Sequence, residues 1–374
     1  MCDISRVEKI DMSTNMRCCL KSSLRSLAAI ILSVFLTMWW IFSAVVFNPV
    51  DRIKGVQNLL PVVTPNLQNE GGIFLLILVT SAPGNFEARS TIRRSWGKRG
   101  KNDAKFHVVF MLGATKEPEI LSKLKEEIGS YGDLIIGKFT DSYSNLPLKS
   151  LMSLRWASQI ESQFTVKTDD DMYIHTTRLY EWLLRHQTSR LYAGKVRQNA
   201  KVNRFRFHRY SVSYKNYQEQ FYPAYCYGGF YVLSREALTS VLSVSKRYHP
   251  FPAEDAYLGV LAKEVGITPV DLSDRIVLMK SNFWTEIEVK CIGAGFLGDA
   301  IAVGDSLKPP SIEYLHQKFA VEIQRLENEV CALNKITLKA KALLGLILLI
   351  VFVVATVLSL YCRQKALNYK IFHE

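Results

Sequence analysis

The 374-residue sequence contains no Asn-X-Ser/Thr sequon, so N-linked glycosylation is not expected. Cysteine is also scarce, with seven residues in the whole chain. Only Cys226, Cys291 and Cys331 lie between the two apolar runs described below. Because three is an odd number, we expect at most one disulfide bond there, with one thiol left over.

No helix-turn-helix or zinc-finger spacing occurs, and the sequence has neither internal repeats nor low-complexity tracts. The formal net charge of +13 therefore indicates an anionic ligand or a membrane surface rather than a dedicated DNA-binding protein. Nucleic acid is not an expected partner, and the sequence says nothing about oligomeric state.

Charge is absent from residues 27–47, a largely apolar run that is long enough to cross a bilayer as a helix. Arg17, Lys21 and Arg25 precede it, so the positive-inside rule places residues 1–26 in the cytosol and the bulk of the chain in a lumen. A cleaved signal peptide is the rival interpretation, but this run is too long for one and lies too far from the N-terminus. We predict a transmembrane signal anchor of type II orientation.

A second uncharged run, residues 342–362, has basic residues on both sides and a length that also suits a transmembrane helix. If both runs cross the membrane, the tail of residues 363–374 is cytosolic. A buried core helix is the alternative, although so long an apolar run beside a charged tail is unusual inside a soluble domain.

Residues 48–72 contain three prolines among polar residues and are predicted to form a stem, followed by one large domain of residues 73–310. Strands are expected at residues 73–80, 106–112, 133–139 and 164–168, and helices at residues 86–96, 117–128 and 146–160. This alternation predicts an α/β fold with a mostly parallel sheet and helices on both faces. Residues 311–341 are expected to form an amphipathic helix and a linker.

Three consecutive carboxylates, Asp169, Asp170 and Asp171, directly follow the expected strand at residues 164–168. Such crowding is costly unless a cation neutralises it, and hard cations such as magnesium and manganese prefer oxygen ligands. Ligands bind at the carboxyl ends of strands in such sheets. Asp169 and Asp171 are therefore candidate ligands of a metal chelated by a nucleotide diphosphate, with Asp170 pointing elsewhere. A solvated acidic turn is the alternative.

Arg89 and Arg93 share one face of the expected helix at residues 86–96. Guanidinium groups beside a helix N-terminus suit a diphosphate, whose oxygens they can bind in pairs. Lys149, early in the third expected helix, is a weaker candidate of the same kind. Each of these residues can equally be an ordinary solvated basic side chain.

Glu254 and Asp255 open an expected helix after Pro250 and Pro252. A carboxylate at this position can act as a general base that removes the proton from an attacking hydroxyl. Acidic residues in a first turn are also common as partners of the helix dipole. Both interpretations remain open on local sequence alone.

Tyr222, Tyr225, Gly228 and Gly229 belong to a stretch that combines aromatic rings with glycines. Sugars pack their C–H faces on such rings, and glycines let the backbone approach a ligand. With Glu254, these residues are candidates for an acceptor site or pocket, although aromatics beside glycine are also ordinary in strands. The nearby basic cluster could bind RNA or anionic sugars, or be a solvated loop; it comprises Arg204, Arg206, His208 and Arg209.

Five motifs occur in order over nearly 200 residues: Ala88–Gly97, Asp141–Lys149, Lys167–Asp171, Tyr222–Ser234 and Glu254–Gly259. Through them the chain resembles the β1,3-glycosyltransferases of glycosyltransferase family 31, which include β1,3-galactosyltransferases and β1,3-N-acetylglucosaminyltransferases. The resemblance implies a GT-A fold, a UDP-sugar donor, bound manganese and inversion at the anomeric carbon.

By position, Asp169 and Asp171 match the family's DxD pair, which holds the metal and the donor, and Asp255 matches its catalytic base. Other matched residues are expected near the nucleotide. The set assigned to the donor is Arg89, Arg93, Lys149, Asp169 and Asp170.

The sequence departs from the family pattern in two places. Val303, Gly304 and Asp305 stand where a histidine usually completes the metal site, so Asp305 is a candidate substitute. The cysteine that follows the Glu-Asp motif in many relatives is also missing, so Cys226 either pairs with Cys291 or stays free. The second apolar run is a further difference from the single-anchor design of the family.

Together these features predict a Golgi membrane enzyme with a lumenal catalytic domain. It would transfer a hexose, with galactose as the leading candidate, from a UDP-sugar to a glycan of a glycoprotein or glycolipid in β1,3 linkage. Transfer of N-acetylglucosamine is one alternative, because donor choice depends on pocket shape. A catalytically silent relative that acts as a Golgi chaperone or binding protein is another. The carboxylates Asp169, Asp171 and Asp255 argue against it, and the missing histidine argues for it.

Overall fold

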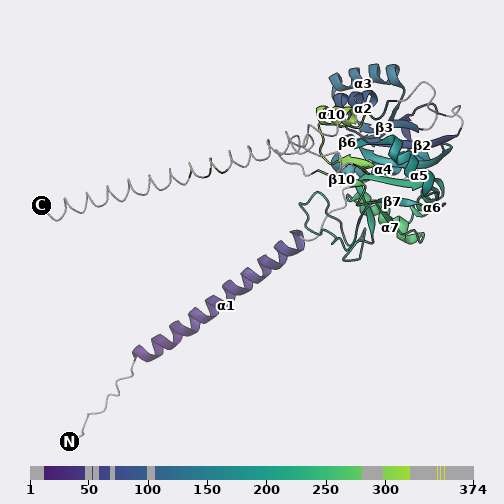
Figure 1. Ribbon diagram of the computed structural model, residues 1–374. Helices are drawn as coiled ribbons and strands as arrows, with labels where there is room; N and C mark the ends of the chain where they lie inside the picture. Colours follow the sequence, from purple (N-terminus) through teal and green to yellow (C-terminus); the bar gives the residue numbers. More distant parts are fainter. Residues whose placement is uncertain are drawn as a thin grey trace, which may run out of the picture.

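The computed structural model describes residues 12–46, 53, 59–67, 72–98, 106–279 and 298–320, together with residues 343, 346 and 349. One long helix, α1 (Met12–Val46), extends away from an α/β domain (Figure 1). The other elements are β1 (Pro61–Val63), β2 (Ile73–Thr80), α2 (Phe86–Arg94), β3 (Phe106–Ala114), α3 (Pro118–Tyr131), β4 (Leu134–Thr140), the 3₁₀ turn η2 (Tyr143–Asn145), α4 (Leu146–Ala157), β5 (Ser162–Asp169), β6 (Met172–Ile174), α5 (Thr176–Arg185), β7 (Tyr192–Arg197), β8 (Tyr225–Ser234), α6 (Arg235–Val244), α7 (Glu254–Glu264), β9 (Val270–Asp271), β10 (Ile276–Leu278), β11 (Ala302–Gly304) and α10 (Pro309–Ala320).

Helix α1 contains the N-terminal apolar run. Its segment Leu27–Val46 is long and apolar enough to cross a membrane, by length and composition, and almost all of its side chains are exposed. The predicted second span, residues 342–362, lies outside the described residues except for Leu343, Leu346 and Leu349, which are helical.

The main sheet has eight strands in the order β1-β4-β3-β2-β5-β8-β7-β9. The four neighbours β4, β3, β2 and β5 are parallel, as the βαβ alternation predicts. Strand β8 runs antiparallel to both β5 and β7, and β1 runs antiparallel to β4, so the sheet is mixed rather than mostly parallel. Strands β7 and β8 are joined by a loop without a crossover helix, a connection that favours antiparallel pairing.

Strand β2 shows why the parallel strands are continuously apolar. Leu76 and Leu78 pack in a cluster with residues of α4, α6 and α7. Leu75, Ile77 and Val79 point to the opposite face and pack with residues of α2, α3 and α5. Because both faces are covered, every position of the strand except the partly buried Phe74 is buried. Each such side chain contributes about 1.5–3 kcal/mol to folding.

The chain order reverses beside β2. From β2 the chain moves through β3 to β4 on one side, then returns through α4 to place β5 on the other side. The carboxyl ends of β2 and β5 are paired, with Thr80 opposite Asp169. This is a topological switch point, the place where ligands bind in open α/β sheets. The acidic cluster therefore lies where the sequence predicts it.

A small second sheet, in the order β10-β11-β6, brings distant segments to the same place. Met172, directly after the acidic cluster, pairs with Gly304. Asp305 is thereby held next to the cluster. Strand β1 lies within the predicted stem, residues 48–72, but extends the main sheet. Helix α10 covers the start of the expected amphipathic helix and packs on the domain, against α2.

Candidate functional site

An open pocket of about 720 Å³ lies at the carboxyl end of β5. Its walls come from the acidic cluster, from β8, from the start of α7, from the turn after β11 and from the loop between β7 and β8. Six of the predicted site residues outside the acidic cluster line it: Tyr222, Tyr225, Gly228, Gly229, Glu254 and Asp255. Asp169, Asp171 and Asp305 line the same pocket.

The Asp171 side chain is fixed by the turn after β11. Its carboxylate accepts a hydrogen bond from the Ser306 backbone N–H at 2.9 Å, and its carbonyl accepts one from Leu307 at 3.1 Å. Asp305 and Ser306 both adopt a positive φ, of 82° and 91°. Such a conformation is strained for residues other than glycine and concentrates at functional sites.

Electrostatics in the cluster are unfavourable without a cation. Burial, together with the neighbouring carboxylates Asp169 and Asp170, raises the pKa of Asp171 to about 7. A positive charge in the pocket would reverse this effect.

Asp170 turns away from the pocket. Its carboxylate accepts hydrogen bonds from the Ser81 hydroxyl at 2.7 Å and from the Asn85 side chain at 2.9 Å. Burial raises its pKa, and the two hydrogen bonds oppose that shift. Asp170 therefore ties the acidic cluster to the loop between β2 and α2.

Asp255 lines the same pocket from the first turn of α7. One of its carboxylate oxygens accepts a hydrogen bond from the Gly228 N–H at 3.2 Å and the other from the Ala256 N–H at 2.8 Å. Burial raises the pKa of Asp255, and these hydrogen bonds oppose the shift. The result is an oriented carboxylate with a raised pKa at the edge of a pocket, an arrangement suited to a general base.

Lys167 connects the acidic cluster with the start of α7, and the sequence analysis assigned it no role. Its ammonium group is buried and contacts Asp169 at 2.8 Å, Glu254 at 3.0 Å and the Gly228 carbonyl at 2.5 Å. Burial lowers the pKa of Lys167, but the two carboxylates outweigh it and raise the pKa overall. A lysine directly after the apolar stretch Phe164–Val166 of a central strand was the available signal, because a buried lysine needs a partner.

Gly228 makes room for these contacts. A Cβ atom at this position would lie 2.7 Å from the Glu254 Oε1 atom and 3.3 Å from the Asp255 Cβ atom. Any other residue at position 228 would therefore displace the side chains of Glu254 and Asp255.

We expect Gly228→Ala to lower the free energy of unfolding by about 1–3 kcal/mol, the usual cost of overpacking. Thermal denaturation of the full chain measures this. Gly129→Ala is the matched control, because a Cβ there meets no atom within 4 Å and alanine favours the α3 helix. Equal stability of the Gly228→Ala and wild-type chains would show that the carboxylates are not held by close packing.

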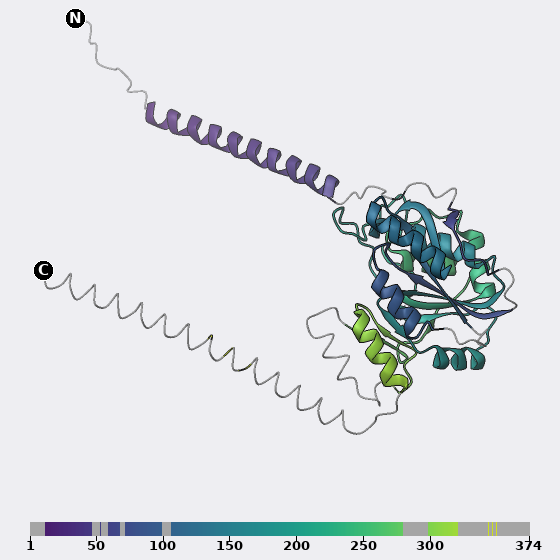
Figure 2. The same cartoon turned by 90° about the horizontal axis from the view of Figure 1, so that it is seen from above.

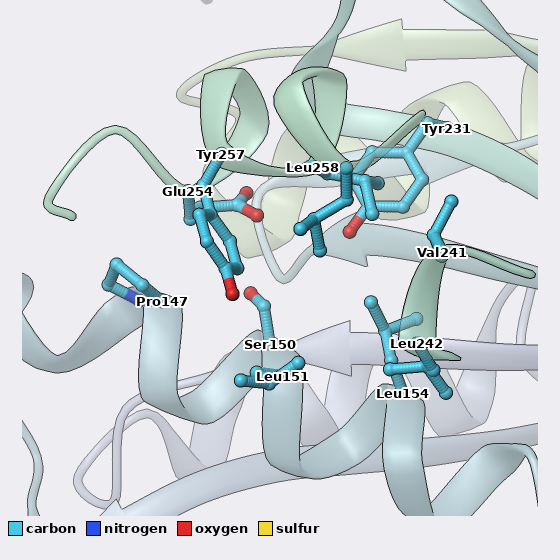
Figure 3. Close-up of a pocket in the computed structure, with 11 residues that line it drawn as sticks. Pro147, Ser150, Leu151, Leu154, Tyr231, Val241, Leu242, Glu254, Tyr257 and Leu258 are labelled. Atoms are coloured by element: carbon cyan, nitrogen blue, oxygen red, sulfur yellow. The ribbon is translucent and has the colours of Figure 1, made fainter. Parts of the chain in front are cut away.

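Glu254 also lines a second, much smaller cavity of about 10 Å³ behind the pocket. Figure 3 shows its side chain beside Ser150 and among leucines of α4 and α7. Ser150 Oγ, Tyr231 OH and Glu254 Oε2 are buried and have no hydrogen-bond partner among the described residues. A cavity of this size and polarity suits a single water molecule. Burial raises the pKa of Glu254 to about 7, while Lys167 opposes the shift.

Arg89 does not reach the pocket. It is fully buried, and all five of its N–H groups donate hydrogen bonds within the protein. Two go to the Glu127 carboxylate, at 2.8 and 2.7 Å, and three go to Ser81, Ala82 and Pro83. Arg89 has no donor left for a phosphate and instead shapes the loop after β2.

Arg93 and Lys149 are likewise engaged by carboxylates. Arg93 binds Asp133 through two hydrogen bonds of 2.8 Å and also pairs with Glu127. Lys149 is buried, pairs with Asp141 at 2.7 Å and donates to the Ser81 carbonyl at 2.8 Å. These basic residues support the switch-point loops from behind, and neither lines the pocket.

The residues present suit a metal ion only in part. Across the described part of the chain, no three His, Cys, Asp or Glu side chains are grouped as a complete metal site. Asp169, Asp171 and Asp305 nevertheless present carboxylate oxygens to one pocket. Magnesium-like ions are commonly held by one or two carboxylates plus substrate phosphates. The donor set therefore fits a hard divalent cation that a diphosphate helps to bind.

Cys226 lies in β8 with a free, fully buried thiol, and burial raises its pKa. Cys291 and Cys331 lie outside the described residues.

Comparison with known proteins now identifies the family. The model of the galactosyltransferase family matches residues 87–273, half of the chain. The chain belongs to this family. The matched range includes Asp169, Asp171, Gly228 and Asp255. The resemblance to β1,3-glycosyltransferases predicted from the five motifs is confirmed.

Relatives of this family member differ in the sugar they are named for. A β1,3-galactosyltransferase of Drosophila melanogaster, brn, is 34% identical over 52% of this chain and 61% of its own length. The UDP-GalNAc:β1,3-N-acetylgalactosaminyltransferase 1 of Rattus norvegicus is 30% identical over 64% of this chain and 79% of its own length. The lactosylceramide 1,3-N-acetyl-β-D-glucosaminyltransferase of Homo sapiens is 34% identical over 53% of this chain and 56% of its own length. The chain thus spans between about half and four-fifths of these relatives.

Proposed function

We propose that this chain is an inverting, UDP-sugar-dependent β1,3-glycosyltransferase with a GT-A-type domain. One observation carries the proposal: Asp255 and the pair Asp169 and Asp171 line a single pocket in a chain of the galactosyltransferase family. α1 would anchor the enzyme in the Golgi membrane, with the domain in the lumen.

In the proposed reaction, the Asp255 carboxylate accepts the proton of an acceptor glycan hydroxyl. The hydroxyl oxygen forms a bond to the anomeric carbon from the face opposite UDP, and the bond from that carbon to the diphosphate oxygen breaks. UDP leaves with the bonding electron pair, so the configuration is inverted. Gly228 and Ala256 orient Asp255 through their N–H groups.

The part of the pocket that carries the acidic cluster would hold the diphosphate. A manganese ion bound by Asp169 and Asp171 would neutralise the negative charge of the leaving group. Asp305 lines the same pocket and is the residue proposed to replace the family's histidine. Tyr222, Tyr225, Gly229 and the other pocket residues would contact the sugars.

Galactose is the donor sugar that we propose first, because the family description and the Drosophila relative both name it. N-acetylglucosamine and N-acetylgalactosamine are the alternatives, since other relatives are named for these sugars. A silent family member that binds glycans or other proteins in the Golgi is a second candidate. It is favoured by the absence of a complete metal site among the described residues.

We expect Asp171→Ala to remove the effect of manganese on UDP binding, because that carboxylate would hold the ion. Titration calorimetry of UDP, with and without manganese, measures the change. The control is Asp274→Ala, since Asp274 is an exposed carboxylate in the turn before β10. Manganese-dependent UDP binding that survives in the Asp171→Ala chain would remove Asp171 from the site.

A further inference from the structure

The loop between β7 and β8 contains a segment with unusual surface chemistry. We call residues 203–210 the aromatic–basic segment, because it has three arginines, one histidine and three aromatic residues but no carboxylate. Phe205 and Phe207 are 44% and 67% exposed, and their rings pack edge to face with centroids 5.7 Å apart. Large apolar side chains of a folded domain are normally buried, so a paired exposure of this kind indicates a contact surface.

This segment touches the end of α1. The Arg206 N–H donates a hydrogen bond of 2.8 Å to the carbonyl of Val46, the last residue of the apolar segment Leu27–Val46. Figures 1 and 2 both show the loop beside this end of the helix. Val46 itself is buried, unlike most of the helix.

This contact fixes the depth of the segment if α1 spans a membrane. Leu27–Val46 has 20 residues, and at about 1.5 Å per residue it matches the roughly 30 Å hydrocarbon core of a bilayer. Val46 then lies at the boundary of the hydrocarbon, and Arg206 lies at the same level. The rings of Phe205 and Phe207, which flank Arg206, are at the membrane interface.

The composition of the segment suits this location. Aromatic rings are enriched at membrane interfaces, where apolar and polar surroundings meet. Arginine side chains bind lipid phosphates in pairs of hydrogen bonds. Within the segment, Arg204 donates hydrogen bonds to the Val212 and Glu219 carbonyls. The positive charge of the segment, which has no carboxylate of its own, still complements a surface of phospholipid headgroups.

The same segment also forms part of the pocket. Asn203, His208, Arg209 and Tyr210 line the pocket together with Asp255. The Arg209 guanidinium lies over the rings of Tyr143 and Tyr210, at 4.9 Å from each centroid. A surface held at the membrane by Phe205 and Phe207 would therefore hold this part of the pocket there too.

We propose that the aromatic–basic segment is a membrane-docking surface whose partner is the phospholipid leaflet that α1 enters. Phe205 and Phe207 insert at the interface, and the positive charge of the segment favours its approach to the headgroup phosphates. A consequence, which rests on the proposed function, is that the pocket opens at the bilayer surface. The acceptors it serves are then short glycans carried on membrane lipids, rather than glycans on protein surfaces far from the bilayer.

The docking is tested by crosslinking that needs no enzymatic activity. The full chain, with p-benzoylphenylalanine in place of Phe207, is reconstituted in nanodiscs of radiolabelled phosphatidylcholine and irradiated. The control carries the same group in place of Tyr131, which is 56% exposed at the end of α3, a helix that lies far from α1 in Figure 1. We expect a lipid adduct at position 207 and none above background at position 131. Equal labelling at the two positions would overturn the proposal.

The consequence for acceptors is tested with Phe205→Ser/Phe207→Ser, since neither ring lines the pocket. We expect kcat/KM to fall about tenfold for a glycan on a lipid in the same nanodisc, and to stay unchanged for the same glycan free in solution. An equal change for both acceptors would overturn the inference that the pocket serves glycans carried on membrane lipids. A chain that crosslinks lipid at position 207 but transfers no sugar would instead overturn the proposed function.

Discussion

Replacing Asp255 with asparagine is expected to lower turnover by about 10²–10⁴-fold, the range that a general base contributes. Asparagine keeps the size of the side chain and can still accept a hydrogen bond from Gly228 or Ala256, but it cannot take the acceptor's proton. The substitution leaves Asp169 and Asp171, the proposed diphosphate and metal site, unchanged. The affinity for UDP is therefore expected to stay nearly unchanged. Steady-state kinetics and UDP titration on the same preparation measure both quantities.

The pH profile of the wild-type chain gives an independent check on Asp255. A general base acts in its deprotonated form, so kcat/KM falls as the pH drops through its pKa. Burial raises the pKa of Asp255 above the ordinary value for aspartate of about 4. We therefore expect the acidic limb of the profile above the ordinary aspartate range, and we expect this limb to disappear in the Asp255→Asn chain. Near-normal turnover in that variant would remove Asp255 as the base.

Replacing Lys167 with methionine is expected to destabilise the domain by about 3–5 kcal/mol, the cost of leaving a buried charge without its partner. Methionine has a similar length but no charge. The variant leaves the buried Glu254 carboxylate without the cation that lies 3.0 Å away, and leaves Asp169 without its partner at 2.8 Å. Thermal denaturation of the full chain measures the loss.

Two further variants separate charge pairing from simple packing at Lys167. In the Lys167→Met background, Glu254→Gln removes the unpaired charge. We therefore expect the double variant to lose less unfolding free energy than the sum of the losses in the two single variants. Lys263→Met is the control, because Lys263 is an exposed lysine of α7 and its replacement should cost less than about 0.5 kcal/mol. Additive effects of Lys167→Met and Glu254→Gln would show that the two side chains do not interact.

The elements that local sequence specifies were predicted well. The apolar run Ile73–Thr80 is strand β2 with the same bounds, because a strand buried on both faces has a continuous apolar sequence. The placement of Asp169 at the end of β5 followed from the same pattern. Glu254 opens α7, as the two preceding prolines predict. In each case the signal lies within a few neighbouring residues.

What the sequence did not predict depends on partners far along the chain. Arg89 has the sequence context of a phosphate-binding residue, but Glu127, 38 residues later, takes up its side chain. Lys167 contacts Glu254 from 87 positions away, and nothing in its own strand specifies that partner. A strand was expected around Gly228–Ser234, where β8 lies, but its antiparallel direction was not predicted. Pairing direction depends on a long irregular loop whose path the local pattern does not encode.

UDP release by the full chain in detergent tests the central claim most directly. UDP-galactose, UDP-N-acetylglucosamine and UDP-N-acetylgalactosamine are offered separately, with and without manganese, over a panel of simple glycoside acceptors. The proposed function predicts manganese-dependent release with one donor, only when an acceptor is present, and its loss in the Asp255→Asn chain. A folded wild-type chain that binds UDP yet releases none from any donor and acceptor would contradict the proposed enzyme and favour a silent member of the family.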